Sequence, residues 1–281
     1  MIEAKHLTHV YNAGTAMESH AFEDVSFRIE RGEFIGIIGH TGSGKSTLIQ
    51  HFNGLLKPTS GTVLFDGDDI FANGYDLRKL RSRVGMVFQY PEYQLFEETV
   101  IKDVMFGPLN MGASEAEAKK AAADALRVAG VEEAFWEHSP FELSGGQKRR
   151  VAIAGVLSMD PEVLILDEPA AGLDPAGRED ILETIASLRK EKNITILLVS
   201  HSMDDVAQYA DRIMVLSKGV LEFFDTPEHV FSHVEELETM GLSAPQITYL
   251  MKDLHDAGLN VDLTAVTVDE AADSILASLP G

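Results

Sequence analysis

The segment Gly39-His40-Thr41-Gly42-Ser43-Gly44-Lys45-Ser46-Thr47 is the strongest indication of fold in this 281-residue chain. Its first eight residues fit the pattern G-x-x-x-x-G-K-[ST], in which backbone N–H groups cradle phosphates, a lysine reaches them and a hydroxyl reaches Mg²⁺. The apolar run 34–38 predicts a buried strand that feeds the loop, and 45–56 predicts a helix whose N-terminus faces the phosphates. We therefore predict a P-loop nucleotide site and disfavour a chance glycine-rich turn.

A second glycine-rich motif, Leu143-Ser144-Gly145-Gly146-Gln147, follows roughly a hundred residues later. Ser144 suits the N-cap of a helix over 147–158, and the two glycines let a ligand approach the backbone closely. Because a helix N-terminus offers free N–H groups and partial positive charge, this motif predicts a second anion site. Lys148, Arg149 and Arg150 come next, and a solvated helix face with ion pairs is the favoured interpretation of this triplet.

Two carboxylates end the apolar run 163–166. Asp167, at the end of a buried strand, can hold Mg²⁺ opposite Ser46. Glu168, the next residue, would project in a different direction from Asp167 and could orient or deprotonate an attacking water. A solvated turn before Pro169 is the alternative, but two carboxylates beside a P-loop favour phosphate chemistry.

Strand patterns around the motifs predict an α/β fold. Residues 25–30 alternate between apolar and polar, which is typical of a half-buried antiparallel strand. Continuous apolar runs indicate a parallel sheet covered on both faces, and they lie at 84–88, 163–166, 194–199 and 213–216. Lys218-Gly219 predicts a hairpin turn.

The middle and the end of the chain have a different character. Between 99 and 158 the strand signal disappears, so we predict a helical insertion with Trp136 packed inside it. From about residue 228 the chain holds ten acidic residues against one basic residue, Lys252. These residues predict an acidic C-terminal appendage over 228–281 with short amphipathic helices. Its histidines are expected on solvated surface rather than at a metal: His229, His233 and His255.

Composition narrows the functional classes. A formal net charge of −22 argues against a nucleic-acid-binding surface, which needs clustered Lys and Arg. The chain has no cysteine, which excludes disulfides and suits a reducing cytosol. No apolar run approaches the roughly 18 residues of a membrane span, and the N-terminus lacks a signal-peptide layout. We therefore expect any membrane association to come through a partner.

The motifs together resemble those of the ATPase subunits of ABC transporters over residues 1–225. The resemblance implies that Tyr11 stacks on adenine, and that Gln89 senses Mg²⁺ and a membrane partner. It also implies that His201 contacts the γ-phosphate, and that Asp174 lies in a loop that crosses to a second subunit. The loop 170–174 reads Ala-Ala-Gly-Leu-Asp, which departs from the commoner Ser-Ala-Leu-Asp.

This resemblance implies an α/β P-loop NTPase of the ABC type over 1–227. It would have a mixed or parallel sheet core, an antiparallel β subdomain and a helical subdomain at about 90–160. The resemblance also implies ATP hydrolysis, with ATP and Mg²⁺ bound. Two subunits would sandwich two ATP molecules head to tail, each between the P-loop of one subunit and the 143–147 motif of the other.

A finer resemblance rests on the run Pro91-Glu92-Tyr93-Gln94-Leu95-Phe96. It is similar to the ATPase subunits of energy-coupling factor transporters, which import vitamins and transition-metal ions. The whole pattern is most similar to the second of the two paralogous ATPases in group-II complexes. In this family the segment receives a transmembrane scaffold protein, whose arginines could meet Glu92, Glu97 and Glu98. A solvated helix start is the alternative for these glutamates.

The resemblance also implies partners and a location. We expect a paralogous ATPase in a heterodimer, with a homodimer as an alternative, and we expect the appendage to help hold the dimer. The transmembrane scaffold and small substrate-binding membrane proteins would complete a complex on the cytoplasmic face of the membrane. No nucleic acid is expected. An ordinary ABC importer is the near alternative; a soluble ABC protein of translation or DNA repair is disfavoured, since the chain lacks a second cassette.

Overall fold

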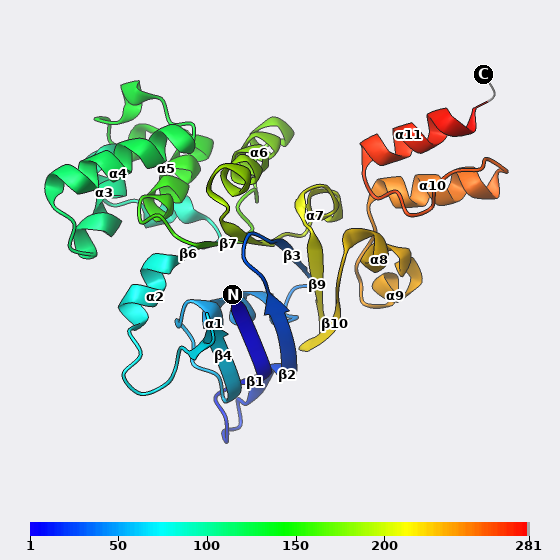
Figure 1. Ribbon diagram of the computed structural model, residues 1–281, viewed down its shortest axis with the longest axis horizontal. Coiled ribbons are helices and arrows are strands. Elements are labelled where there is room, and N and C mark those ends of the chain that lie inside the picture. The colour runs from blue at the N-terminus through cyan, green and yellow to red at the C-terminus, as the bar shows by residue number, and fades with distance from the viewer. Residues whose placement is uncertain (280–281) are drawn as a thin grey trace.

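A six-stranded sheet forms the centre of the chain in a computed structural model that describes residues 1–279 (Figure 1). Its strand order is β10-β9-β3-β8-β7-β6, and all neighbours pair in parallel except the β9–β10 hairpin. The strands are β3 (Phe34–Ile38), β6 (Val84–Val87), β7 (Val163–Asp167), β8 (Thr195–Val199), β9 (Arg212–Ser217) and β10 (Val220–Asp225). Every residue of β3, β7 and β8 is buried, which confirms the prediction of a sheet covered on both faces.

A second sheet is antiparallel and covers one face of the first. Its order is β2-β1-β4-β5, with β1 (Ile2–Tyr11), β2 (Ser19–Ile29), β4 (Ser60–Phe65) and β5 (Asp68–Asp69). Side chains at 25, 27 and 29 are buried while 26 and 28 are exposed, as the alternation predicts. This sheet and helix α1 (Lys45–Phe52) share one hydrophobic cluster with β3, β7 and β8.

Helices cover the other face of the central sheet. The segment after β6 forms η1 (Pro91–Gln94), α3 (Val100–Asn110), α4 (Glu115–Val128), η2 (Glu133–Phe135), η3 (Pro140–Glu142) and α5 (Gly145–Leu157). Together with α6 (Pro175–Lys192) these helices bury a second cluster against β7 and β8. Trp136 packs against this cluster and donates to the Val131 carbonyl oxygen at 3.1 Å, so the predicted helical insertion is confirmed.

Helix α1 is shorter than the sequence predicts: it ends at Phe52, not Leu56. Gly54 has a φ of +68°, a left-handed conformation that ends many helices. The backbone N–H groups of Leu55 and Leu56 then donate back to the Gln50 carbonyl oxygen at 3.0 and 3.1 Å. A side chain at position 54 would also meet Leu77 of α2 (Leu77–Arg83). The apolar pattern in the sequence therefore extends to Leu56, although the turn at Gly54 ends the helix earlier.

The C-terminal appendage packs in two parts (Figure 1). Helices α8 (Pro227–Ser232) and α9 (Val234–Thr239) share a cluster with β9 and with α7 (Met203–Tyr209). Helices α10 (Gln246–Asp256) and α11 (Val268–Ser278) instead form a small cluster of their own. The domain boundary at 227/228 therefore stays a prediction, since part of the appendage shares a core with the ATPase fold. Within residues 1–279, no helix has the length and apolar character to cross a membrane.

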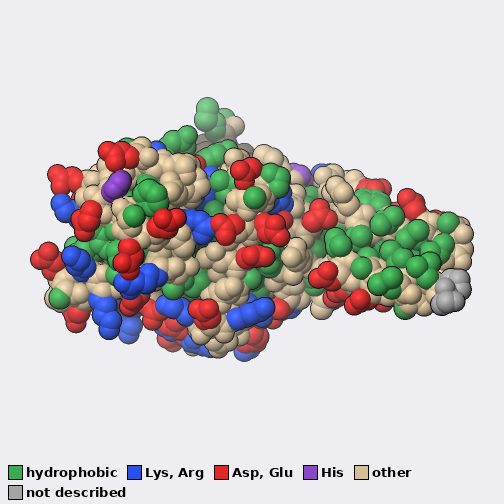
Figure 2. Space-filling model, turned by 90° about the horizontal axis from the view of Figure 1, so that it is seen from above, with side chains coloured by type: hydrophobic (Ala, Val, Ile, Leu, Met, Phe, Trp, Pro, Cys, Tyr) green, Lys and Arg blue, Asp and Glu red, His purple; other side chains and the backbone are tan. Residues whose placement is uncertain are grey.

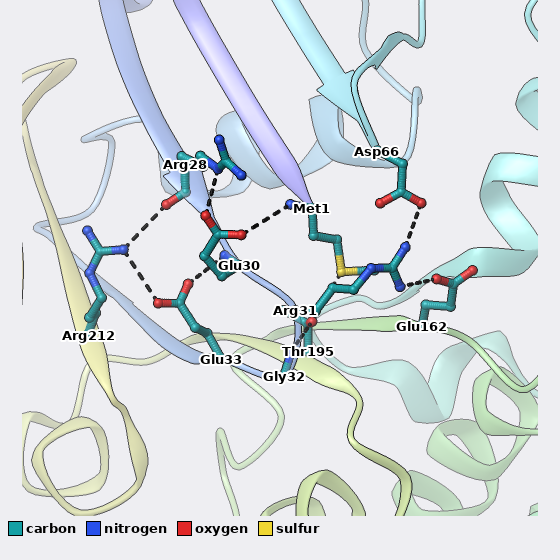
Figure 3. Close-up of polar contacts among 10 residues, drawn as sticks. All are labelled: Met1, Arg28, Glu30, Arg31, Gly32, Glu33, Asp66, Glu162, Thr195 and Arg212. Carbon is teal, nitrogen blue, oxygen red and sulfur yellow. Dashed lines mark hydrogen bonds and ion pairs between the residues drawn. The ribbon is translucent and has the colours of Figure 1, made fainter.

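A ring of alternating charges joins the two sheets at the edge where the parallel strands begin. Figure 3 shows the contacts of Arg31 with Asp66 and Glu162 in this ring. Arg31 contacts Asp66 at 2.7 Å and Glu162 at 2.6 Å, and Arg83 contacts the same two carboxylates. Asp66 follows β4, Glu162 precedes β7 and Arg31 precedes β3. Hydrogen bonding from Arg83 is the main cause that lowers the pKa of Glu162 to about 2.

We predict that Glu162→Gln lowers the free energy of unfolding at pH 7 by on the order of 1 kcal/mol, because the ring is partly exposed. A lowered pKa means that Glu162 contributes stability above about pH 4.5, and that this contribution is lost as the pH falls towards 2. Urea unfolding from pH 7 down to pH 3 measures the difference between variant and wild type. Asp160→Asn, an exposed neighbour, is the control. A difference that does not shrink on acidification contradicts the assignment.

Candidate active site

The P-loop connects β3 to α1 and wraps around Lys45. The buried Lys45 Nζ donates to the carbonyl oxygens of Gly39 at 2.7 Å and His40 at 3.1 Å. Gly39 is required here, since a Cβ would lie 2.3 Å from the Leu216 carbonyl oxygen. Gly42 and Gly44 have φ values of +82° and +102°, which orient the loop backbone as only glycine does readily. The sequence-predicted cradle is therefore present and preformed.

The environment of Lys45 suits an anion. Burial lowers the pKa of Lys45, while the negative charges of Glu168 and Asp167 act in the opposite direction. A phosphate in the loop would add compensating charge to a desolvated ammonium. The Ser43 hydroxyl also fits a polar ligand in the loop, because it is buried and finds no hydrogen-bond partner among the described residues.

Asp167 and Ser46 form the pair that was predicted to hold Mg²⁺. Asp167 is the buried last residue of β7, and burial raises the pKa of its carboxyl group. A hydrogen bond with Ser46 and the charge of Lys45 counteract this rise. A carboxylate and a hydroxyl are the hard oxygen donors that Mg²⁺ takes together with water and phosphate oxygens. The two side chains therefore fit the ion.

Glu168 lies between Gln89 and His201. Gln89 Nε2 donates to Glu168 Oε2 at 2.8 Å, and His201 Nε2 lies 2.6 Å from Glu168 Oε1. The Glu168 backbone turns into the left-handed region at φ +51°, while its N–H still donates to the Val199 carbonyl oxygen. Glu168 is thus in direct contact with each of the other two predicted catalytic residues.

Tyr11 is placed at the first turn of α1. Its hydroxyl lies 3.0 Å from Thr47 Oγ1, and its ring stays partly exposed beside the loop. Two buried histidines that the sequence analysis missed lie behind it: His51 Nε2 is 3.1 Å from His9 Nδ1. Burial lowers the pKa of His51 to about 4, so this imidazole is neutral at pH 7, and burial lowers the pKa of His9 as well. The one sequence signal was that His9 and Tyr11 lie two residues apart on a strand.

The motif 143–147, called the signature motif below, is separate from this group. Ser144 accepts from the Gln147 N–H, and Gln147 Oε1 accepts from the Ser144 N–H, which forms a capping box at the start of α5. Gly145 is exposed, and a Cβ there or at Gly146 would meet no atom within 4 Å. No hydrogen bond within residues 1–279 joins the motif to the P-loop. Asp174 caps α6 by accepting from the Gly177 N–H at 2.7 Å.

Two expectations need correction. The prediction of a solvated basic triplet is wrong for Arg149, whose side chain is only 3% exposed, and for Arg150, whose side chain is 15% exposed. Glu92 is not a free carboxylate for a scaffold arginine, because it is 17% exposed and paired with Arg149. The corrections for Arg149 and Glu92 have one cause. Helix α5 packs against η1, so Arg149 and Glu92 face each other in the buried contact between these two elements. Glu97 is half-buried, and Glu98 is exposed and pairs with Lys102 at 2.8 Å, so contact of these two residues with a scaffold protein stays a prediction.

A buried lysine in a glycine loop, facing two carboxylates at the end of a parallel strand, defines a P-loop nucleoside triphosphatase. The family model for ABC transporters matches residues 22–171. The chain is 54% identical over 276 residues to the energy-coupling factor transporter ATP-binding protein EcfA2 of Clostridium tetani, which covers 98% of this chain and 96% of that protein. The chain belongs to the ABC transporter family and, within it, to these energy-coupling factor ATP-binding proteins.

Further comparisons agree with this assignment. A protein of the same name from Caldanaerobacter subterraneus is 50% identical over all of this chain and 98% of its own length. The structure of cbiO1 from Clostridium perfringens, part of the transporter complex cbiONQ, is 42% identical with a TM-score of 0.76, covering 89% of this chain and 98% of that one. A dimeric ATP-binding cassette bound to ADP and Pi is 32% identical with a TM-score of 0.71, covering 81% and 99%.

These comparisons confirm the predicted family and the α/β P-loop fold of the ABC type. They also confirm the predicted ATPase activity and the use of ATP with Mg²⁺. The roles of single residues, Tyr11, Asp167 and Glu168 among them, stay predictions that the geometry supports.

We predict that Lys45→Ala weakens ATP binding roughly tenfold to a hundredfold, since it removes charge-assisted hydrogen bonds to phosphate. Equilibrium binding of a fluorescent ATP analogue measures the change. Lys79→Ala, at an exposed lysine of α2, is the matched control and should bind like wild type. Near-normal affinity in Lys45→Ala would remove the lysine from the phosphate site.

We predict that Glu168→Gln still binds ATP but hydrolyses it roughly 10²–10⁴ times more slowly, the usual contribution of a general base. The amide keeps the size of the side chain and loses the ability to take a proton. Steady-state phosphate release measures the turnover. Glu179→Gln, at an exposed acid of α6, should retain wild-type turnover. Wild-type turnover in Glu168→Gln would mean that another group accepts the proton.

Proposed function

We propose that this chain is the ATP-hydrolysing subunit of an energy-coupling factor transporter, which powers uptake of vitamins or transition-metal ions. The observation that carries the proposal is Glu168, held between Gln89 and His201 beside the P-loop lysine. Membership of the energy-coupling factor family supports the transport role. The chain would lie peripherally on the cytoplasmic face of the membrane, attached through its partners.

Each residue of the site has its own role in ATP hydrolysis. The P-loop N–H groups and Lys45 hold the phosphates, and Tyr11 lies where an adenine could stack on its ring. Ser46 and Asp167 would hold Mg²⁺, with Gln89 nearby; the ion supplies neutralisation of phosphate charge. Glu168 accepts a proton from water as the water oxygen bonds to the γ-phosphorus and the bond to the β–γ bridging oxygen breaks. ADP and phosphate then leave. His201, whose Nε2 lies against Glu168 in the structure, would contact the γ-phosphate of bound ATP once that nitrogen turns from the carboxylate.

The separate signature motif is best explained by a second ATPase subunit. Its exposed helix N-terminus would cover the ATP on the partner's P-loop, and the partner's motif would cover the ATP on this chain.

Figure 2 shows apolar side chains gathered over the appendage. The exposed large apolar residues there are Leu250, Leu263, Val268, Leu276 and Leu279. We propose this patch as a contact that helps hold the dimer with a paralogous ATPase, or with a second copy.

Residues 90–98, called the docking segment below, are the proposed contact with the transmembrane scaffold protein. Tyr93 is 84% exposed and Phe96 is 55% exposed, and the Phe96 ring meets that of Phe106 edge-on at 4.9 Å. Glu97 adds negative charge to the docking segment, while Glu98 pairs with Lys102 at 2.8 Å. Exposed aromatic side chains with a charged rim are typical of protein interfaces. An apolar scaffold helix that carries arginines would complement this surface.

The direct test is purification of the tagged chain from native membranes in mild detergent, with its partners identified by mass spectrometry. A second ATPase, one scaffold protein and several small substrate-binding membrane proteins are expected. A pair of dedicated permeases would instead move the chain to the ordinary ABC importers. Recovery with ribosomes or DNA-repair factors would contradict the transport function.

We predict that Phe96→Asp reduces the scaffold protein recovered with the chain by about tenfold, since interface aromatic side chains contribute about 2 kcal/mol or more. Quantitative mass spectrometry of the purified complex measures the ratio. Met17→Asp, at an exposed apolar residue outside the docking segment, is the control and should keep the scaffold. Undiminished recovery with Phe96→Asp would place the interface elsewhere.

A further inference from the structure

Arg149 is a buried cation that joins three parts of the ATPase. It lies in the second turn of α5, close to the signature motif at the start of that helix. Its Nε and Nη2 donate to the Glu92 carboxylate at 3.1 to 3.3 Å, and its Nη1 donates to the Ala171 carbonyl oxygen at 2.7 Å. Glu92 belongs to the docking segment and Ala171 to the loop 170–174. One guanidinium therefore links the docking segment, the signature helix and that loop.

The chemistry of this link favours a fixed geometry. A buried charge is tolerated only with a close partner, so breaking the Arg149–Glu92 pair would leave an uncompensated charge inside the protein. The planar fork of arginine can hold a carboxylate with one edge and a carbonyl with another. Lysine has the same charge but no such fork. Moving Glu92 should therefore move Arg149, and with it α5, as one unit.

The docking segment is also held at its other end. Asp103 of α3 accepts from the N–H groups of Phe96 and Glu97 at 2.8 and 2.9 Å. Tyr90, at the start of the segment, has a φ of +55°, which is an uncommon conformation for a side chain of this size. The segment is thus clamped to α3 and α5 and is connected to β6 through a bent residue. Such an arrangement passes displacement to the helices rather than absorbing it.

The neighbouring arginine provides a contrast. Arg150 donates to the Ala129 carbonyl oxygen and pairs with Asp180, so it connects α5 to the end of α4 and to α6. It is mostly buried as well, with 15% of its side chain exposed. Neither contact involves the docking segment. The two adjacent arginines of α5 therefore make different connections. Arg150 links α5 to α4 and α6, whereas Arg149 links α5 to the docking segment and the loop 170–174.

We propose that Arg149 is a positioning residue that couples the scaffold protein to the signature motif. Displacement of the docking segment would move Glu92, and Arg149 would transfer this movement to the signature helix and to the loop 170–174. The signature motif faces ATP on the partner subunit, so scaffold position and ATP closure would be linked through one ion pair. This inference rests on the proposed function, because it needs a scaffold at the docking segment.

The test uses the complete transporter, with its partner ATPase, in proteoliposomes. Uptake and ATP hydrolysis are measured together for Arg149→Lys, Glu92→Gln and the matched control Arg150→Lys. We expect the first two to lower uptake per ATP hydrolysed by about threefold or more, the range of coupling mutations. ATP affinity of the isolated chain should stay at the wild-type value, because neither residue contacts the P-loop. Arg150→Lys should keep the wild-type ratio.

Two further measurements separate coupling from folding. Thermal unfolding and recovery of the assembled complex report structural damage, which alone would lower the amount of complex but not the uptake per ATP. The double variant Arg149→Lys/Glu92→Gln should show an uptake per ATP no lower than that of the poorer single variant, because both substitutions break the same link.

A wild-type ratio in both Glu92→Gln and Arg149→Lys would overturn the proposal, and so would an equal loss in Arg150→Lys. If Arg149→Lys fails to fold, Glu92→Gln decides alone. Failure of the wild-type chain to assemble with a scaffold would instead contradict the proposed function.

Discussion

Parallel pairing of β3, β8 and β7 is the constraint on which the rest of the site depends. Ile37 and Asp167 both pair with Val199, so the three strands end at one level of the sheet. The chain continues from these ends into the P-loop, Glu168 and His201. Because parallel strands present their carboxyl ends at the same edge, ligand-binding residues from distant parts of the sequence meet there. The antiparallel sheet and the helices keep the strands buried, and so keep this edge fixed.

The same chain places its signature motif, which we propose as a second anion site, elsewhere. The signature motif starts α5 on the helical insertion, with its capping box complete and Gly145 exposed at the helix N-terminus. A site built as two halves can be assembled only when subunits meet, which lets ATP control association. The Arg149 link then connects that half-site to the docking segment. One ATPase domain would thus combine nucleotide chemistry with contact to a membrane protein.

Local patterns determined most of what the sequence could predict. The P-loop, the strand before Asp167 and the alternation in β2 are each decided by neighbouring residues, and all are present. Burial of Arg149 could not be predicted, since a basic triplet on a helix does not reveal which member faces η1. The charge ring of Arg31, Asp66, Arg83 and Glu162 likewise needs residues brought together by tertiary packing. The same holds for contact of Glu168 with both Gln89 and His201, although each residue was a candidate.

If each ATP lies between two subunits, the subunits should associate when nucleotide binds. Sedimentation velocity of the Glu168→Gln chain, alone and mixed with the paralogous ATPase, would be measured with and without Mg²⁺ and ATP. We predict a dimer that forms with nucleotide in at least one of the two samples, and that is lost when Gly145 is replaced by a residue with a bulky charged side chain. Bound ATP with only monomers in both samples would contradict the shared site.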